Sequence, residues 1–153
     1  MRILIAEDDK YKADAIFSFL ESRFEDLSVD FARSFSSALF KVIDSAEGFD
    51  LIVLDMSMPS FDVSEKDPSG GNPESYAGED FLSQMTLMGH KTPVIVVTQY
   101  DSFGTDEKQI SLSKLTEKLY KDHRDVFRGS IYFNAATNSW KNKLWTLIDE
   151  IVF

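Results

Sequence analysis

Two short, continuously apolar runs that each end in carboxylates place the strongest constraint on the fold. The first run, residues 3–6, is followed by three acids at positions 7–9, and the second, residues 51–54, is followed by Asp55. Such runs are too short for helices and are typical of fully buried strands. The carboxyl ends of parallel strands meet at the edge of the sheet where open α/β folds bind ligands. The sequence therefore predicts one acidic site at this edge, which is costly to assemble without a cation.

Composition narrows the class of protein. The chain has 153 residues, 43% hydrophobic and 27% charged, which suits one soluble domain with a proper core and is too short for two. No apolar stretch approaches the roughly 20 residues of a membrane span, and no signal-peptide pattern opens the chain, so we expect a cytoplasmic protein. Absence of cysteine excludes disulfides and thiolate metal sites. A net charge of −10 argues against nucleic-acid binding, which depends on cationic contacts.

Strand-like and helix-like segments alternate along the whole chain. Strands are expected at residues 3–6, 29–31, 51–54, 94–97 and 131–133. Apolar residues at helical spacing predict helices at about residues 10–24, 35–43, 78–88, 107–121 and 140–151. This alternation implies a parallel sheet with right-handed crossovers and helices on both faces. We therefore predict a single three-layer α/β/α domain over residues 1–153.

One segment has neither pattern. Residues 60–77 contain several prolines, glycines and acids without an apolar period. A stretch of this length is a mobile loop for which a functional or disordered role is more common than a tight turn. Its acids lack the spacing of a calcium-binding loop.

Four sequence motifs together resemble the receiver domain of two-component response regulators (the CheY-like family). They are Arg2-Ile-Leu-Ile-Ala-Glu-Asp-Asp9, Leu51-Ile-Val-Leu-Asp-Met-Ser-Met-Pro59, Gly78-Glu-Asp-Phe-Leu82 and Pro93-Val-Ile-Val-Val-Thr98. The resemblance covers nearly the whole chain, with an inserted loop at residues 60–77 and an extended segment with a helix at 101–128. It implies the flavodoxin-like fold, with five parallel strands in the order 2-1-3-4-5.

The resemblance also implies a role for individual residues. Asp55 corresponds to the phosphoacceptor, and Thr98 to the residue that hydrogen-bonds the phosphoryl group. Asp8 corresponds to a direct Mg²⁺ ligand, Glu7 to a ligand acting through water, and the backbone carbonyl of Ser57 to a further ligand. Mg²⁺ prefers about six oxygen ligands, some of them water, and this set supplies such oxygens.

One family residue is missing from the last predicted strand. Receivers carry a lysine at its end, whereas this chain has Phe133 or Asn134 there. The change removes a cation from a site that holds a phosphoryl group of about two negative charges, which affects phosphorylation-triggered switching more than metal binding. The sequence leaves open whether Lys41, Lys91 or Lys141 reaches the site instead.

The leading hypothesis is a stand-alone receiver, not an enzyme, that accepts a phosphoryl group on Asp55 from a histidine kinase or histidine phosphotransfer protein. It would signal by binding a downstream protein, without nucleic acid or membrane. The alternative is a pseudo-receiver that is never phosphorylated and serves as an interaction module. A metal-dependent phosphohydrolase is a weaker option, because Asp55 is followed by Met56 and Ser57 and not by an Asp-x-Asp motif.

Each candidate residue also has a purely structural interpretation. Asp55 could cap a turn, and Thr98 could simply end a strand. Glu7 and Asp8 could be helix N-terminal acids that favour the macrodipole, a role for which Asp9 is the better candidate.

Overall fold

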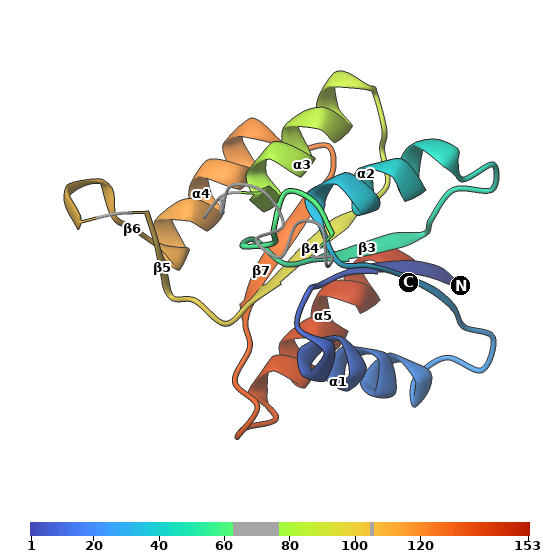
Figure 1. The fold of residues 1–153 in the computed structure, drawn as a ribbon. Coiled ribbons are helices and arrows are strands. Elements are labelled where there is room, and N and C mark those ends of the chain that lie inside the picture. The colour runs from blue at the N-terminus through green and yellow to red at the C-terminus, as the bar shows by residue number, and fades with distance from the viewer. Residues whose placement is uncertain (63–76, 105) are drawn as a thin grey trace.

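Five parallel strands form the central sheet of the computed structural model, which describes residues 1–62, 77–104 and 106–153. Their order is β2-β1-β3-β4-β7, the order predicted from the receiver resemblance (Figure 1). The strands are β1 (Arg2–Ala6), β2 (Ser28–Ala32), β3 (Leu51–Leu54), β4 (Val94–Thr98) and β7 (Phe127–Tyr132). The predicted loop at 60–77 falls largely on residues 63–76, which lie outside the described part of the chain.

Helices cover both faces of the sheet and complete three layers. They are α1 (Lys10–Glu21), α2 (Phe35–Asp44), α3 (Ala77–Leu87), α4 (Leu112–Asp122) and α5 (Ser139–Val152). Helices α1 and α5 lie on one face, and α2, α3 and α4 on the other (Figure 1). The predicted flavodoxin-like α/β/α class is therefore confirmed.

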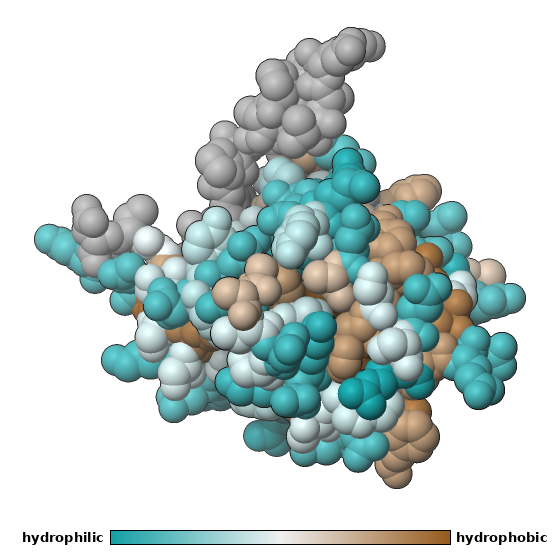
Figure 2. Space-filling model, turned by 90° about the horizontal axis from the view of Figure 1, so that it is seen from below, coloured by the Kyte–Doolittle hydropathy of each residue, from teal (hydrophilic) through white to brown (hydrophobic). Residues whose placement is uncertain are grey.

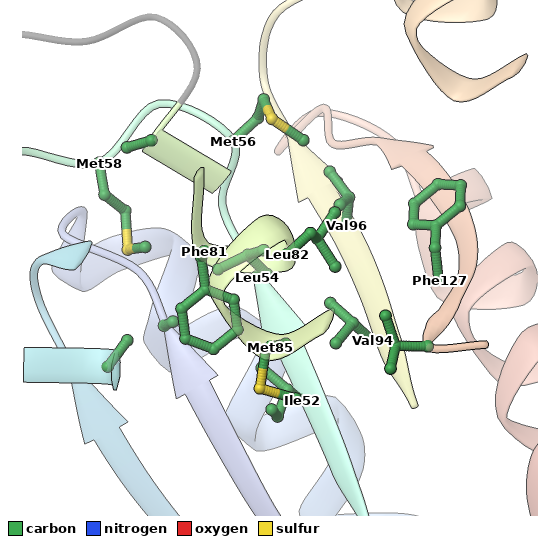
Figure 3. Close-up of a cluster of buried hydrophobic side chains, with 14 of the residues drawn as sticks. Ile52, Leu54, Met56, Met58, Phe81, Leu82, Met85, Val94, Val96 and Phe127 are labelled. Carbon is green, nitrogen blue, oxygen red and sulfur yellow. The ribbon is translucent and has the colours of Figure 1, made fainter. Parts of the chain in front are cut away.

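The central strands are apolar at every position because both faces are covered. Successive side chains of a strand point to opposite faces. In β3, Ile52 and Leu54 accordingly join the core under α2, α3 and α4, whereas Leu51 and Val53 join the core against α1 and α5. Figure 3 shows the first of these cores, in which methionine and phenylalanine side chains from α3 and from the turn after β3 pack onto the strands. Strand β2 lies at the edge of the sheet, and its residues are of mixed polarity.

The segment between β4 and β7 differs from its prediction. A helix was expected over residues 107–121, but α4 begins only at Leu112. A small antiparallel pair precedes it, β5 (Ser102–Phe103) and β6 (Ile110–Ser111), with the 3-10 turn η1 (Asp106–Lys108) between them. Ile110 pairs with Phe103 in this hairpin, and the Ser111 side chain caps α4 by accepting a hydrogen bond from the Lys114 amide.

The last strand was also misplaced. It was expected at residues 131–133, whereas β7 starts at Phe127 and ends at Tyr132. Phe127 and Gly129 pair with Val94 and Ile95, and this pairing extends the strand through the charged and small residues that hid it from the apolar pattern.

The face of the molecule that includes α1 and α5 is mixed in character. Figure 2 views the molecule from below Figure 1 and shows hydrophobic side chains interspersed with hydrophilic ones. Among the described residues, no helix is both long and apolar enough to cross a bilayer.

Candidate functional site

Three of the predicted acids lie together at the carboxyl edge of the sheet. Strands β1 and β3 pair in parallel with Ala6 beside Leu54, so the residues that follow them, Glu7 and Asp55, emerge side by side. One carboxylate oxygen from each of Glu7, Asp8 and Asp55 lies within 4.8 Å of the others. Glu7 and Asp55 are buried, and Asp8 is exposed. The geometry therefore brings the acids into one potential ligand set.

A buried lysine that sequence reasoning overlooked lies within this acidic cluster. The Nζ atom of Lys12, in the first turns of α1, lies 2.5 Å from Glu7 Oε2 and 3.3 Å from Asp55 Oδ1. The lysine residue is 1% exposed. Within the described part of the chain, these three atoms are buried without a hydrogen bond of regular geometry. They are therefore held chiefly by the attraction of their charges.

A sequence signal for Lys12 does exist. It precedes Ile16 by four residues and Leu20 by eight, and both of these are fully buried. Residues at this spacing share one face of a helix, so Lys12 continues the apolar stripe of α1 toward the end of the sheet. A lysine on a buried stripe needs a charged partner, and the acids after β1 and β3 provide it.

The crowding of carboxylates changes their protonation. Burial, and after it the negative charge of Asp55, raises the pKa of Glu7 to about 8, against the opposing influence of Lys12. Partial burial of its carboxyl group and the charge of Asp55 also raise the pKa of Asp8. Both pKa shifts thus reflect burial first and the neighbouring charge of Asp55 second, and Lys12 offsets them only in part.

The end of β4 lies next to the acids. Thr98 is fully buried, and its hydroxyl accepts a hydrogen bond from the Tyr100 amide at 3.2 Å. The Gln99 side chain donates to Asp9 Oδ2 at 3.2 Å and so links this strand end to α1. Asp9 caps α1 by accepting from the Lys12 amide, as its sequence position predicted. The half-buried Ser57 lies two residues beyond Asp55, in the turn after β3.

A glycine allows α3 to approach Asp55. A Cβ atom on Gly78 would lie 2.9 Å from Met56 Cα and 3.0 Å from the carbonyl oxygen of Asp55. These are backbone atoms at distances that side chains do not adopt. The Gly78 amide also donates a hydrogen bond to the carbonyl oxygen of Met56. The first turn of α3 thus packs directly onto the Asp55–Met56 backbone and holds it in place.

Neither residue at the position of the family lysine points a charge at Asp55. Phe133 is buried against the ring of Trp140, with 4.9 Å between ring centroids. The Asn134 side chain accepts a hydrogen bond from the Ala136 amide, next to its own backbone. The position of the family lysine is therefore part of the apolar core between α1 and α5.

The three lysines considered as substitutes have other environments. Lys91 pairs with Asp125 at 2.9 Å, and Lys141 lies 5.6 Å from the centre of the Trp140 ring. Lys41 lines a surface pocket together with Arg2, near the start of β1. Within the described chain, the ion pairs of Asp55 and Glu7 are made by Lys12.

The donor set fits a hard divalent cation. It consists of carboxylate oxygens within reach of one another, one of them on the solvent-exposed Asp8, as Mg²⁺ prefers. Two of the three acids, Glu7 and Asp55, also contact Lys12, so the lysine and a metal ion would share the negative charge of the cluster. The residues present therefore fit Mg²⁺.

Comparison of the fold defines the class of protein. A response regulator receiver domain from Clostridium thermocellum matches with a TM-score of 0.66, covering 99% of this chain and 93% of that one at 16% identity. A response regulator receiver domain from Francisella matches with a TM-score of 0.64, covering 98% and 94% at 20% identity. The fold is that of a receiver domain.

Sequence comparison then gives the family. No family model matches the chain. The Detocs response regulatory protein DtcB of Enterobacter cloacae (strain JD6301) is 30% identical over 151 residues, which cover 99% of this chain and 100% of DtcB. The uncharacterized protein y4jR of Sinorhizobium fredii (strain NBRC 101917 / NGR234) is 27% identical over 94% of both chains. The chain belongs to the response regulator family, with DtcB as a relative that it matches from end to end.

Membership sets the broad role of the protein. Receiver domains of this family are signalling modules rather than enzymes. They act with partners such as kinases or phosphotransfer proteins and typically bind Mg²⁺ in an acidic pocket.

Proposed function

We propose that this protein is a receiver that accepts a phosphoryl group on Asp55 from a histidine kinase or histidine phosphotransfer protein, with Mg²⁺ bound at Glu7, Asp8, Asp55 and the Ser57 carbonyl. The phosphorylated form then binds a downstream protein. One observation carries the proposal: the Asp55 carboxylate lies in a cluster of acids that also contains a buried cation, Lys12. The proposal places the protein in the cytoplasm, where kinases use ATP.

The transfer uses Asp55 as a nucleophile. One carboxylate oxygen attacks the phosphorus atom of the donor phosphohistidine, and a P–O bond forms as the P–N bond to the imidazole breaks. The imidazole nitrogen leaves with the electron pair of that bond. Asp55 needs no general base, because an ionised carboxylate carries no proton to remove. The product is an acyl phosphate on Asp55.

Charge neutralisation is the main contribution of the surrounding residues. Phosphoryl transfer depends chiefly on positioning and on stabilising the charge that spreads over the phosphoryl oxygens. Bound Mg²⁺ would supply positive charge on one side of the group. The Thr98 hydroxyl, buried at the end of β4, would donate a hydrogen bond to a phosphoryl oxygen. Gly78 keeps α3 against the Asp55 backbone, so the nucleophile stays at the strand end.

Mass spectrometry after incubation with a small phosphoryl donor tests the proposal. With Mg²⁺ and acetyl phosphate or phosphoramidate, the intact protein should gain the mass of one phosphoryl group, and hydroxylamine should remove it, as expected for an acyl phosphate. Asp55→Asn should abolish the gain, whereas Asp14→Asn, an exposed acid on α1, should not change it. Folded wild-type protein that takes no phosphoryl group from these donors or from a phosphohistidine protein would contradict the proposal.

A pseudo-receiver that is never phosphorylated remains the second candidate. One observation favours it: Phe133 and Asn134 stand where the family lysine is expected, and neither can supply a cation. In that case the affinity for a partner protein should be the same for wild type and Asp55→Asn, with and without acetyl phosphate. A partner whose affinity changes on phosphorylation would exclude this alternative.

A further inference from the structure

We propose that Lys12, from the first helix, is the phosphoryl-binding cation of this receiver, in place of the lysine that the family carries after its last strand. The inference rests on the proposed phosphorylation of Asp55. Its structural basis is the position of Lys12 Nζ, 3.3 Å from Asp55 Oδ1 and almost fully shielded from solvent.

The environment of the amine is unusual for a structural lysine. Removing an ammonium group from water costs several kcal/mol, and close partners with good hydrogen bonds are needed to offset this cost. Lys12 Nζ has two carboxylate oxygens near it but no regular hydrogen bond within the described residues. An ammonium has three donors on a flexible four-carbon stem. The group is therefore buried beside Asp55 with donor capacity still available.

Phosphorylation would give this amine a stronger partner. The ester oxygen of an acyl phosphate carries little charge, whereas the attached phosphoryl group carries about two negative charges at neutral pH. The charge that Lys12 pairs with would thus move outward from Asp55 Oδ1 onto the phosphoryl oxygens. Glu7 contacts the same amine and is the partner that Lys12 can retain or release as the phosphoryl group arrives.

The position of the missing lysine supports this assignment. The Phe133 ring is packed on Trp140, which in turn contacts Phe19 of α1, so this corner of the molecule is an apolar core between α1 and α5. Lys12 and Phe19 are both buried residues of α1, and the amine of Lys12 contacts the acids. An aromatic ring therefore fills the position of the family lysine, and the positive charge beside Asp55 comes from Lys12 on α1.

The proposed role of Lys12 predicts a result that a purely structural ion pair would not give. Its two partners, Asp55 and Glu7, are also two of the three acids of the candidate metal site. Loss of its charge should therefore strengthen Mg²⁺ binding, because one competing cation is gone, and weaken binding of a phosphoryl group. A lysine that only stabilised the fold would affect both ligands in the same direction.

The test measures two ligands on Lys12→Met, which keeps the length and apolar surface of the stem. Mg²⁺ alone and beryllofluoride with saturating Mg²⁺ are titrated by calorimetry, since beryllofluoride binds carboxylates as a phosphoryl mimic. We expect Lys12→Met to lose about tenfold to a hundredfold in beryllofluoride affinity, the range for a hydrogen bond to a charged group. Its Mg²⁺ affinity should stay the same or rise. The matched control is Lys10→Met, an exposed lysine on the same helix, which should leave both affinities unchanged.

The outcomes separate this inference from the proposed function. Wild type that binds neither beryllofluoride nor a phosphoryl group contradicts the proposed function itself. Wild type that binds beryllofluoride, with Lys12→Met binding it equally well, overturns the role of Lys12 alone. Loss of Mg²⁺ and beryllofluoride affinity together in Lys12→Met also overturns it, because that result marks a structural lysine.

A second pair of variants applies if Lys12→Met does not fold. Glu7→Gln combined with Lys12→Met removes one negative and one positive charge, so the formal charge of the cluster is the same as in wild type. Compared with Glu7→Gln alone, the double variant should show the same tenfold or greater loss of beryllofluoride affinity. Equal affinities in the two variants would overturn the proposal.

Discussion

The two ends of strand β1 each hold a cation among acids, but they differ in how completely the cation is bound. At the start of the strand, the Arg2 guanidinium lies 3.0 Å from Asp30 Oδ2 and donates hydrogen bonds to Ser45 Oγ at 2.8 Å and to the Gly48 carbonyl at 3.3 Å. It also lies 4.7 Å from the centre of the Phe49 ring. The donors of Arg2 are thus directed at fixed acceptors.

At the carboxyl end of β1, the hydrogen bonding of the cation is less complete. Lys12 contacts only the carboxylates of Glu7 and Asp55 among the described ion pairs, although it is more deeply buried than Arg2. A planar guanidinium with rigid donors suits a permanent link between strands and loops, whereas an ammonium can exchange partners. On this comparison we interpret the amino end of β1 as a structural joint, and we propose that the carboxyl end is the binding site. Variants at the two ends should therefore respond differently to Mg²⁺.

Lys12→Met should have the largest effect on stability. Removing one partner of a buried ion pair leaves the charge of the buried acids around Asp55 uncompensated, and should lower the free energy of unfolding by about 3 kcal/mol without metal. Mg²⁺ should restore part of this loss by binding the folded state. Urea titration with and without Mg²⁺ measures both effects. Equal stability of the variant and wild type would show that the carboxylates do not depend on the amine.

The pH dependence of stability gives a second large effect at the same end of β1. The pKa of Glu7 is raised from 4.5 to about 8 in the folded protein, so the folded state holds a proton that the unfolded state has lost between these values. The stabilisation is complete below about pH 4.5 and is lost as the pH rises to about 8. The free energy of unfolding should therefore fall with rising pH, by at most about 1.4 kcal/mol per pH unit for one proton.

Glu7→Gln supplies the control for this pH dependence. The variant cannot ionise at position 7, so its metal-free stability should vary less between pH 5 and 8 by urea titration. Saturating Mg²⁺ should flatten the wild-type curve as well, because a metal ion favours the ionised carboxylate. A wild-type stability that rises over this range would contradict the raised pKa of Glu7.

Arg2→Met should have a smaller effect that is independent of metal. The guanidinium is partly exposed, and loss of its hydrogen bonds to Ser45 and Gly48 should cost about 1 to 2 kcal/mol. Because Asp30 stays near solvent, Mg²⁺ should not restore the loss. The same urea titrations provide the measurement. A strong Mg²⁺ effect on this variant would mean that the two ends of β1 are coupled.

The smallest effect is expected for an exposed pair at the amino edge of the sheet. Lys91, before β4, donates a 2.9 Å hydrogen bond to Asp125, before β7, and this contact lowers the pKa of Asp125. The pair contributes stability above the unfolded pKa of the carboxyl group and loses it as the pH falls. In Lys91→Ala the pKa of Asp125 should rise toward its ordinary value, as followed by NMR titration of the side-chain carboxyl. An unchanged pKa would show that the pair is broken in solution.

Much of the carboxyl edge could be predicted from sequence because it depends on strands. Residues 3–6 and 51–54 are apolar throughout, and parallel pairing forces the residues after them to the same edge. The observed register, with Ala6 beside Leu54, places Glu7 and Asp55 together as expected. The capping role of Asp9 likewise follows from local geometry and was predicted.

The rest depended on contacts between distant segments. Lys12 was not among the predicted site residues, and only the approach of α1 to both strand ends shows that it is buried. The β5–β6 hairpin was missed because a two-residue strand such as Ile110–Ser111 leaves no periodic signal. The helical spacing of apolar residues over 107–121 extended the predicted helix across this short strand. The observed helix begins after its capping residue, Ser111.

The aromatic core at Phe133 has a consequence for where a cation can stand near Asp55. A lysine introduced at position 133 would enter an apolar environment against Trp140, while Lys12 already occupies the space beside the acids. That substitution alone would therefore not rebuild the family arrangement. A search for the cation in the last strand alone would overlook Lys12, which lies about 120 residues earlier in the chain.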